Sequence, residues 1–208
     1  MNTPPEYFTE MYRDADDPWG LGSRWYEQRK YAVTTASLPR RRYRSAFEPA
    51  CSVGVLSALL ADRCDRLLSC DRSERAVAAA RHRLAGRPGV RVERLVLPAD
   101  WPERRFDLIV LSEFLYYFGA ADADDLLRRA VDSLEPGGTL LAVHWRRPVA
   151  EHAQQGEAVH RAVRAVPGLV RIAGHQEPDF LLDVLIRTGS PAEAGPESLS
   201  VAAAEGLA

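Results

Sequence analysis

Phe47-Glu-Pro-Ala-Cys-Ser-Val-Gly54 connects two stretches of different periodicity. The short run Ser45–Pro49 favours a β-strand, and Val55–Arg63 carries leucines at the spacing of a helix. A turn of small residues between a strand and a helix lets a ligand come close to the backbone. We therefore predict a strand–turn–helix unit whose turn is suited to a nucleoside.

An acidic residue, Asp71, comes directly after the next predicted strand, Arg66–Cys70. A carboxylate in this position accepts hydrogen bonds from ribose hydroxyls. Dinucleotide binding requires glycine where the pyrophosphate approaches, whereas Ser52 stands in the middle of the turn. A ligand without phosphates, such as S-adenosylmethionine (SAM), makes no such demand. The alternative is an ordinary strand-to-helix turn, with an Asp71 that only starts the next helix.

Downstream of the turn, short apolar runs alternate with helical periodicity, which is typical of a βαβ series. The run Phe106–Leu111 is nearly all apolar, as in a central parallel strand that is buried on both faces. Strands are predicted at Ser45–Pro49, Arg66–Cys70, Val90–Leu95, Phe106–Leu111, Thr139–Trp145, Leu169–His175 and Phe180–Arg187. Helices are predicted at Val55–Arg63, from the N-cap Ser73 to about Leu84, at Ala121–Leu134 and at Glu151–Val166.

Two connections decide the predicted topology. Glu135-Pro-Gly-Gly138 cannot continue a helix, so we expect it to turn the chain into the strand Thr139–Trp145. Gln176–Asp179 is too short for a parallel crossover, so the last two strands form an antiparallel hairpin. The fold class is therefore α/β, a Rossmann-like seven-stranded sheet of five parallel strands plus a C-terminal antiparallel hairpin, with helices on both faces. In this order, Thr139–Trp145 reaches Phe106–Leu111 only through the first strand.

Composition divides the chain into three regions. Residues 1–44 are aromatic and mixed in charge, and we predict that they form an N-terminal helical lid. Residues 45–187 carry the alternating strands and helices and are predicted to form the SAM-binding domain. Residues 188–208 contain almost no large apolar side chains to offset the entropy of ordering, so a disordered tail is predicted there.

The overall composition excludes several classes of protein. The 208 residues suit one domain, and a net charge of −2 argues against a dedicated nucleic-acid or membrane-surface binder. The 3 cysteines have no CxxC spacing, which disfavours a disulfide framework or a zinc site. With no signal-peptide pattern and no apolar run long enough for a bilayer, we expect a soluble, cytoplasmic protein. Lys30 is the only lysine among 27 basic residues, a skew that codon bias explains.

Four strings in order resemble the motifs of class I SAM-dependent methyltransferases. FEPACSVG stands in place of the glycine-rich first motif and LLSCD in place of the ribose-binding motif. FDLIVLSE matches the fourth-strand motif, and LEPGG matches the turn before the fifth strand. The antiparallel final strand is also typical of that family. The resemblance covers about residues 7–187, and it implies SAM as the cofactor.

Within that superfamily, the chain is most similar to the nodulation protein S-like group, typified by N-methyltransferases that act on the amino sugar of chitooligosaccharides. The strings that carry this similarity are DPWG and WYE in the N-terminal region, PADWP, SEFLYYF and AVHWR. The similarity implies methyl transfer to a small-molecule acceptor, with an amine favoured. The predicted protein has no nucleic-acid or membrane partner and is a monomer or a homodimer.

The chain departs from the family pattern at two places. Ala50 and Ser52 stand where the first motif usually has glycine, and their Cβ atoms narrow the pocket and restrict φ. Val96-Leu97 replaces the acidic residue that holds the adenine amino group in many relatives, and Asp100 is the nearest carboxylate. Either Asp100 or a backbone carbonyl is then left to contact the adenine.

Ligands of open α/β sheets bind beyond the carboxyl ends of the strands, so cofactor-binding residues are expected there and in the N-terminal lid. In the lid, Arg24 can pair with the methionine carboxylate of SAM, Trp19 can exclude water, and Tyr26 is a further lid residue. The alternative is that these residues belong to amphipathic helices that only pack on the sheet. The predicted cofactor-binding residues are Trp19, Arg24, Glu48, Ala50, Cys51, Ser52, Gly54, Asp71, Arg72, Asp100 and Ser112. No metal ligands are predicted.

Three residues are candidates for the chemistry. Glu113 can hold an acceptor ammonium and take its proton, or it can simply cap the next helix. Tyr116 can face the sulfonium through a cation–π contact, or it can pack inward. His144 can be a proton acceptor, or a buried histidine bonded to a carbonyl. His160 and His175 have no partner at ligand spacing and receive no role.

Other functions remain open from the sequence. An O-methyltransferase of similar architecture, with His144 as the base, is the nearest alternative. A catalytically silent member that serves as a binding subunit is another, motivated by Ala50, Ser52 and Val96. A nicotinamide oxidoreductase is disfavoured by Ser52 and by the terminal hairpin.

Overall fold

A mixed β-sheet forms the middle layer of the protein. The computed structural model describes residues 1–189 and 200–207. Seven strands are ordered β3-β2-β1-β4-β5-β7-β6, with β1 to β5 parallel and β7 antiparallel to both β5 and β6. They are β1 (Ala46–Glu48), β2 (Leu67–Asp71), β3 (Val90–Arg94), β4 (Phe106–Ser112), β5 (Leu134–Trp145), β6 (Leu169–Gln176) and β7 (Phe180–Arg187). The predicted fold class, including the terminal hairpin, is confirmed.

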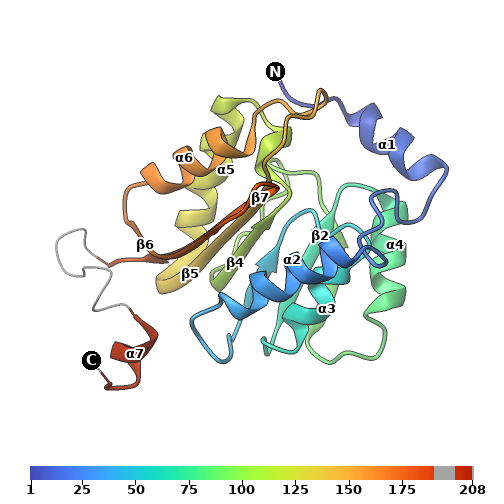
Figure 1. Ribbon diagram of the computed structural model, residues 1–208. Coiled ribbons are helices and arrows are strands. Elements are labelled where there is room, and N and C mark those ends of the chain that lie inside the picture. The colour runs from blue at the N-terminus through green and yellow to red at the C-terminus, as the bar shows by residue number, and fades with distance from the viewer. Residues whose placement is uncertain (190–199, 208) are drawn as a thin grey trace.

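Helices cover both faces of the sheet (Figure 1). Those on one side are α2 (Trp25–Ala36), α3 (Val55–Ala61) and α4 (Glu74–Arg83). On the other side lie α5 (Ala120–Ser133) and α6 (Gly156–Ala165). The remaining helices are α1 (Pro5–Arg13), the one-turn 3₁₀-helix η1 (Leu115–Tyr117) and the short α7 (Val201–Ala204). Within the described residues, no helix has the length and apolarity needed to cross a membrane.

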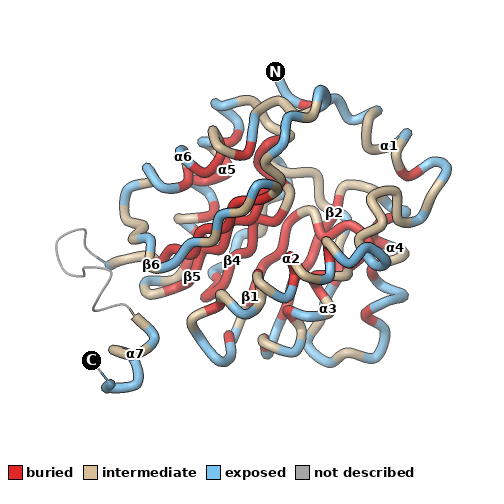
Figure 2. Tube along the Cα trace, viewed as in Figure 1, coloured by how far each residue is buried: buried red, intermediate tan, exposed pale blue. Residues whose placement is uncertain are grey.

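Side-chain alternation along the strands separates two apolar cores. In β4, Ile109 and Leu111 pack with α5 and α6 in one core, whereas Leu108 and Val110 pack with α2 and α3 in the other. All seven residues of β4 are buried, which Figure 2 shows as a continuous red strand in the middle of the sheet. Burial on both faces explains why Phe106–Leu111 reads as an uninterrupted apolar run.

The structure corrects three details of the sequence analysis. β5 already begins at Leu134, so residues 135–138 lie within an irregular strand, because Leu134 pairs with Phe106 and the register shifts before Thr139. Helix α6 begins at Gly156 rather than Glu151. β5 also lies directly against β4, so the expectation that β1 separates them is wrong.

The predicted tail is only partly described. Residues 190–199 and 208 lie outside the described residues. Among those described, Val201–Ala204 forms the helix α7, which is capped by the Ser200 side chain. The tail therefore stays a prediction for the part that the structure does not describe.

Gly54 sets the close packing of α3 against α4. It is the N-cap of α3 and has a φ of 76°, a left-handed conformation that favours glycine. A Cβ at this position would lie 3.0 Å from Ala80 Cβ and 3.1 Å from Ala80 Cα, in α4. The glycine at the end of the first turn is therefore required by backbone conformation and by helix packing.

Gly54→Ala is expected to lower the free energy of unfolding by roughly 3 kcal/mol, because a positive φ costs about 1–2 kcal/mol and overpacking a further 1–3 kcal/mol. Gly86→Ala is the matched control, since Gly86 has the same φ of 76° but a Cβ there would meet no atom within 4 Å. Urea unfolding measures both. Equal losses in the two variants would show that close packing on Ala80 contributes nothing.

Candidate active site

A cavity of about 760 Å³ opens at the carboxyl edge of the sheet. Its walls come from the turn after β1, the end of β2, the loops after β3 and β4, and the end of β5. Residues from α1, α2 and the segment between these helices close the remaining side. This volume lies within the range of about 300–1,000 Å³ that is typical of small-molecule sites.

Most of the residues predicted to form the site lie together in this cavity. None of the described residues forms a cluster of His, Cys, Asp and Glu that could hold a metal ion. The predicted residues that line the cavity are Trp19, Arg24, Tyr26, Glu48, Ala50, Cys51, Ser52, Asp71, Arg72, Ser112, Glu113 and Tyr116. The structure therefore brings both ends of the predicted site together, the turn after β1 and the loop after β4.

The turn after β1 keeps a glycine-like backbone although it lacks two glycines. Ala50 has a φ of 54° and Ser52 a φ of 48°, both in the left-handed region. The Ser52 N–H donates to Asp71 Oδ2 at 3.0 Å, and the Ser73 N–H donates to Asp71 Oδ1 at 2.9 Å. These bonds fix Asp71 at the cavity wall, where each oxygen keeps a lone pair for a ligand hydroxyl.

Glu48 is a buried carboxylate at the end of β1. It is 1% exposed and accepts hydrogen bonds from the hydroxyls of Ser57 and Ser69. Burial raises the pKa of Glu48 to about 7, against the opposing effect of the two hydroxyl donors. Glu48 therefore titrates near neutral pH at the base of the cavity.

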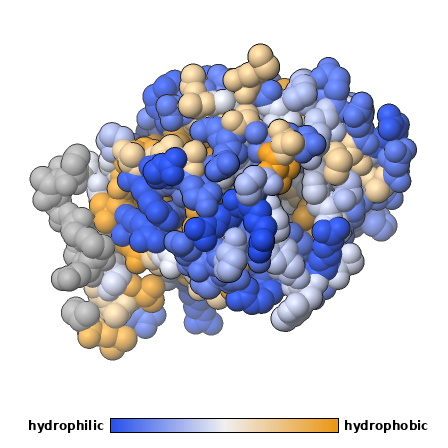
Figure 3. Space-filling model, turned by 45° about the horizontal axis from the view of Figure 1, so that its top comes forward, coloured by the Kyte–Doolittle hydropathy of each residue, from blue (hydrophilic) through white to orange (hydrophobic). Residues whose placement is uncertain are grey.

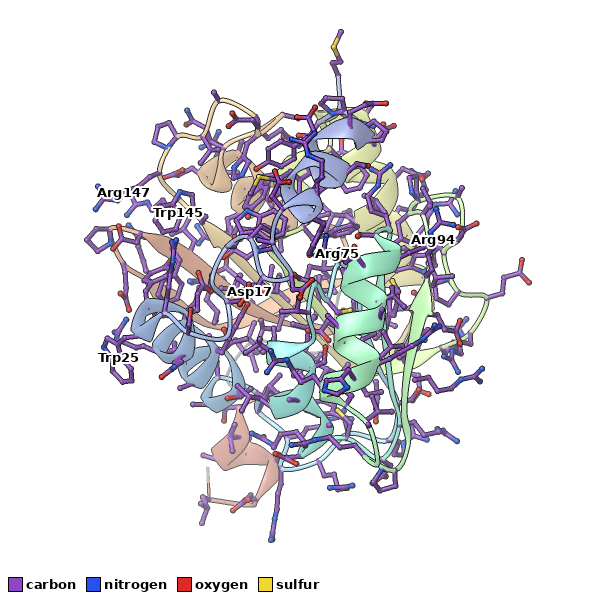
Figure 4. All side chains as sticks on the ribbon, turned by 90° about the vertical axis from the view of Figure 1, so that its right-hand side faces the viewer. Asp17, Trp25, Arg75, Arg94, Trp145 and Arg147 are labelled. Atoms are coloured by element: carbon purple, nitrogen blue, oxygen red, sulfur yellow. The ribbon has the colours of Figure 1, made fainter. Side chains whose placement is uncertain are left out.

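Helix α1 forms a strap across the open side of the cavity. At its start, the Thr3 N–H donates to the Tyr117 carbonyl at 2.8 Å, which ties it to η1. At its end, Tyr12 Oη lies 2.5 Å from Ser52 Oγ, which ties it to the turn after β1. Arg75, labelled on α4 in Figure 4, binds Asp16 at 2.8 Å and secures the following segment to α4. The structure thus places α1 and the segment after it across the strand ends, and the role of a lid stays a prediction.

The loop after β4 carries Glu113, whose side chain accepts three hydrogen bonds. Glu113 has a φ of 49°, and its Oε1 accepts from Lys30 Nζ at 2.7 Å. Its Oε2 accepts from Tyr116 Oη at 2.5 Å and from the Trp145 N–H at 2.8 Å. On the other side, Lys30 Nζ lies 2.7 Å from Glu27 Oε2. One ammonium therefore joins two carboxylates from α2 and the β4 loop.

Burial and charge act in opposite directions on these groups. Burial raises the pKa of Glu113, but the Lys30 charge and three hydrogen bonds lower it more, so the net shift is downward. Burial lowers the pKa of Lys30, but Glu113 and Glu27 raise it more. The cluster holds two carboxylates for one ammonium, among the rings of Tyr26 and Tyr31, whose centroids lie 5.2 and 5.5 Å from Nζ. The cluster suits a cationic ligand.

Sequence reasoning missed Lys30 and Glu27. Both line the cavity, and Lys30 is 2% exposed although lysine is rarely buried. The one signal in the sequence was that Lys30 is the only lysine of a chain that otherwise uses arginine. Codon bias explains the arginines, but it does not explain the single exception.

The structure does not support the predicted role of His144. This residue is fully buried in β5 and does not line the cavity. Its Nε2 accepts from the Leu115 N–H at 3.2 Å, so its Nδ1 carries the proton and faces His160 Nε2, also at 3.2 Å. Burial holds the pKa of His144 well below its usual value. Both ring nitrogens are engaged inside the protein, so His144 has no free lone pair for a substrate proton.

His160, which received no role, continues this chain of contacts. Its Nδ1 donates to Asp183 Oδ2 at 2.7 Å, and Arg164 and Arg171 bind the same carboxylate. The network therefore runs from η1 through two buried histidines to a buried aspartate in β7. It orients the loop that carries Glu113 and Tyr116.

Two predicted cofactor residues also lie outside the cavity lining. Asp100 is exposed and does not line the cavity. Its Oδ2 accepts a hydrogen bond from the Val96 N–H at 2.8 Å, which stabilises the loop after β3. Gly54 faces α4, as described above. Leu95, Val96 and Leu97 line the cavity instead of a carboxylate, which makes that wall apolar.

Ala50→Gly tests the backbone strain of the first turn. A positive φ costs alanine roughly 1–2 kcal/mol, and glycine costs about 0.5–1 kcal/mol in unfolded-state entropy. We expect the free energy of unfolding to stay unchanged or to rise by up to about 1 kcal/mol. In the exposed middle of α4, Ala78→Gly should instead lower it by about 1 kcal/mol. Equal losses by urea unfolding would contradict the strain at Ala50.

Glu48→Gln tests the buried carboxylate. The pKa of Glu48 is raised from 4.5 to about 7, so between these values the folded state binds more protons than the unfolded state. The stability that Glu48 contributes is full below pH 4.5 and is lost as the pH rises through about 7. The stability of Glu48→Gln relative to the parent should therefore increase from pH 5 to pH 8. A relative stability that is constant over this range would show that Glu48 does not titrate there.

The chain matches a known protein family. The family model described as Nodulation protein S (NodS) matches residues 7–163, which include the strap, the turn after β1 and the loop after β4. Nodulation protein S of Bradyrhizobium diazoefficiens is 30% identical over 149 residues, 69% of this chain and 71% of that protein. The chain covers a smaller share, 54%, of nodulation protein S of Rhizobium tropici, at 31% identity over 129 residues.

Solved structures show the same architecture. A Pseudomonas syringae protein, provisionally assigned as a methyltransferase, is 49% identical with a TM-score of 0.71, over 79% of this chain and 100% of that one. The N-methyltransferase NodS from Bradyrhizobium japonicum WM9, in complex with S-adenosyl-L-homocysteine (SAH), has a TM-score of 0.74 at 23% identity, over 90% and 99% of the two chains. The latter likeness shows the shared fold. With the family match over residues 7–163, we conclude that the chain belongs to the nodulation protein S family.

Proposed function

We propose that the protein transfers the methyl group of SAM to the amine of a small molecule, and that this amine belongs to an amino sugar. The proposal rests on the Glu27–Lys30–Glu113 cluster, which has two carboxylates for one ammonium. The cluster lies in a cavity that aromatic side chains and Asp71 also line. Such a cluster attracts a protonated amine and the sulfonium of SAM alike. A phenol or an alcohol gains nothing from it.

The residues present fit SAM in the part of the cavity nearest the turn after β1. Asp71 would accept hydrogen bonds from the ribose hydroxyls, and Ala50 and Ser52 would lie against the methionine portion. The apolar wall of Leu95, Val96 and Leu97 would contact the adenine. When bound, SAM supplies an activated methyl group, so the protein needs no metal for this transfer.

The protein's own task is to orient the acceptor and to exclude water. Tyr116 and Tyr117 face the cavity from η1, and Tyr116 is fixed by its bond to Glu113 and by stacking on His152 at 3.8 Å between ring centroids. The α1 strap covers the open side, and we assign it the role of the lid. Glu113 has a lowered pKa, which makes it an anchor for positive charge more than a base.

A small acceptor also agrees with the outer surface. Most of the face seen in Figure 3 is hydrophilic, and no broad hydrophobic area covers its centre. His144, the residue suggested as the base of an O-methyltransferase, does not reach the cavity. The amine acceptor is therefore the function that the cavity supports best.

Incubation with methyl-labelled SAM tests the proposal, using glucosamine, simple alkylamines and phenols as acceptors. We expect label in amines, with glucosamine the best acceptor of the three groups, because a protonated amine is attracted by the negative cluster. Calorimetry with SAM and SAH accompanies the assay. Turnover of phenols alone would reject the nitrogen acceptor, and the absence of binding heat with either nucleoside would reject SAM itself.

A further inference from the structure

Two buried polar atoms at the start of α2 lack hydrogen-bond partners. In the part of the chain that the structure describes, only three buried side-chain oxygens or nitrogens are unpartnered, namely Tyr26 Oη, Glu27 Oε2 and Glu157 Oε2. The first two belong to consecutive residues, and both residues line the cavity. Glu27 Oε2 still has the Lys30 ammonium 2.7 Å away, whereas Tyr26 Oη has no partner of either kind. A buried hydroxyl without a partner costs about 1–3 kcal/mol, so Tyr26 Oη indicates an absent ligand.

Aromatic packing restricts the directions in which the Tyr26 hydroxyl can find a partner. The ring packs edge-on against Trp145 and Phe180, with centroids 5.5 and 6.4 Å away. Lys30 Nζ lies 5.2 Å from its centroid. Burial and the nearby carboxylates of Glu113 and Glu27 raise the pKa of Tyr26, so the hydroxyl remains protonated. It can both donate and accept a hydrogen bond.

Glu27 keeps acceptor capacity despite its ion pair. Its Oε2 lies 2.7 Å from Lys30 Nζ, but Lys30 directs its aligned hydrogen bond to Glu113 Oε1. The two carboxylates therefore differ, because Glu113 has three aligned donors and Glu27 Oε2 has none. Burial raises the pKa of Glu27 in spite of Lys30, whereas the pKa of Glu113 is lowered. Glu27 is the stronger base of the two.

We propose that Tyr26 and Glu27 form the acceptor subsite, in which Glu27 binds the acceptor nitrogen and takes its proton while the Tyr26 hydroxyl binds a neighbouring polar group of the same molecule. Lys30 and Glu113 are then positioning residues that hold Glu27 in place. The subsite rests on the proposed function, and it defines the substrate class as amines that carry a hydroxyl or another hydrogen-bonding group close to the nitrogen.

The proton and electron balance is simple. The acceptor ammonium gives one proton to the Glu27 carboxylate and becomes a neutral amine. The nitrogen lone pair forms a bond to the methyl carbon of SAM, and the electrons of the breaking carbon–sulfur bond remain on sulfur, which gives SAH. The product is a methylammonium ion, and Glu27 returns its proton to water when the product leaves.

Glu27→Gln and Tyr26→Phe test the subsite, with glucosamine as the probe. At neutral pH, Glu27→Gln should lower kcat by about 100-fold, the scale of general-base catalysis. The deficit should shrink at a pH above the pKa of the amine, where the nucleophile is already neutral. Tyr26→Phe should raise KM about 3- to 10-fold with little change in kcat, as for one lost hydrogen bond. SAH affinity should stay within about twofold in both variants.

Matched controls separate binding from folding. The Tyr43 hydroxyl donates to Thr139 Oγ1 at 3.1 Å, away from the cavity, so Tyr43→Phe should lower thermal stability but leave glucosamine kinetics unchanged. Tyr26→Phe should instead leave thermal stability unchanged and raise the KM for glucosamine, because the Tyr26 hydroxyl has no partner in the folded chain. Glu103→Gln, on an exposed loop, controls for the loss of a carboxylate.

The outcomes distinguish the subsite from the function on which it rests. If the parent protein methylates glucosamine and both variants keep its kinetics, the subsite is wrong and the proposed function stands. If the parent binds SAH but methylates phenols and no amine, both proposals are wrong. Should Glu27→Gln fail to bind SAH, Tyr26→Phe decides alone, and an unchanged KM in that variant overturns the subsite.

Discussion

The buried ammonium of Lys30, held between the carboxylates of Glu27 and Glu113, ties the N-terminal region to the sheet. An unpaired charge in such a place would cost several kcal/mol, so the cluster forms only when α2 and the loop after β4 are both in position. The contacts to Lys30, Tyr116 and Trp145 also hold Glu113 at a left-handed φ that a glutamate rarely adopts. The same pairing thus completes the cavity wall and places two carboxylates and one ammonium on it.

Backbone strain is concentrated at this cavity. Among the described residues, Ala50, Ser52 and Glu113 are the non-glycine residues with positive φ, and all three line it. The family pattern places glycine at the first two positions, and the chain keeps the glycine conformation with the smallest side chains available. The Tyr12–Ser52 contact gives the serine a role that glycine could not have, because it anchors the α1 strap to the turn. The departure from the pattern therefore adds a link between the α1 strap and the turn after β1.

A second buried network supports the same loop from behind. His144, His160 and Asp183 connect η1 to β7, and both histidines are fully enclosed. From the sequence, His144 and Glu113 are both candidates for the chemistry, since His144 lies at the end of an apolar strand and Glu113 just after one. The two side chains differ in position. His144 lies within β5, which continues to Trp145, and its side chain is buried in the protein interior. Glu113 lies just beyond β4, and its side chain lines the cavity.

The amino-acid sequence by itself determined the strands and their direction, the terminal hairpin, and the turn and aspartate of the predicted cofactor site, because local periodicity and short spacings encode these features. It also placed Glu113 and Tyr116 correctly at a strand end. Only the tertiary structure decided that Lys30 and Glu27 belong with Glu113, 83 residues beyond Lys30 in the chain, and that His144 and Asp100 turn away. Such contacts between distant segments depend on how α2 packs across the sheet, and no local pattern in the sequence records that packing.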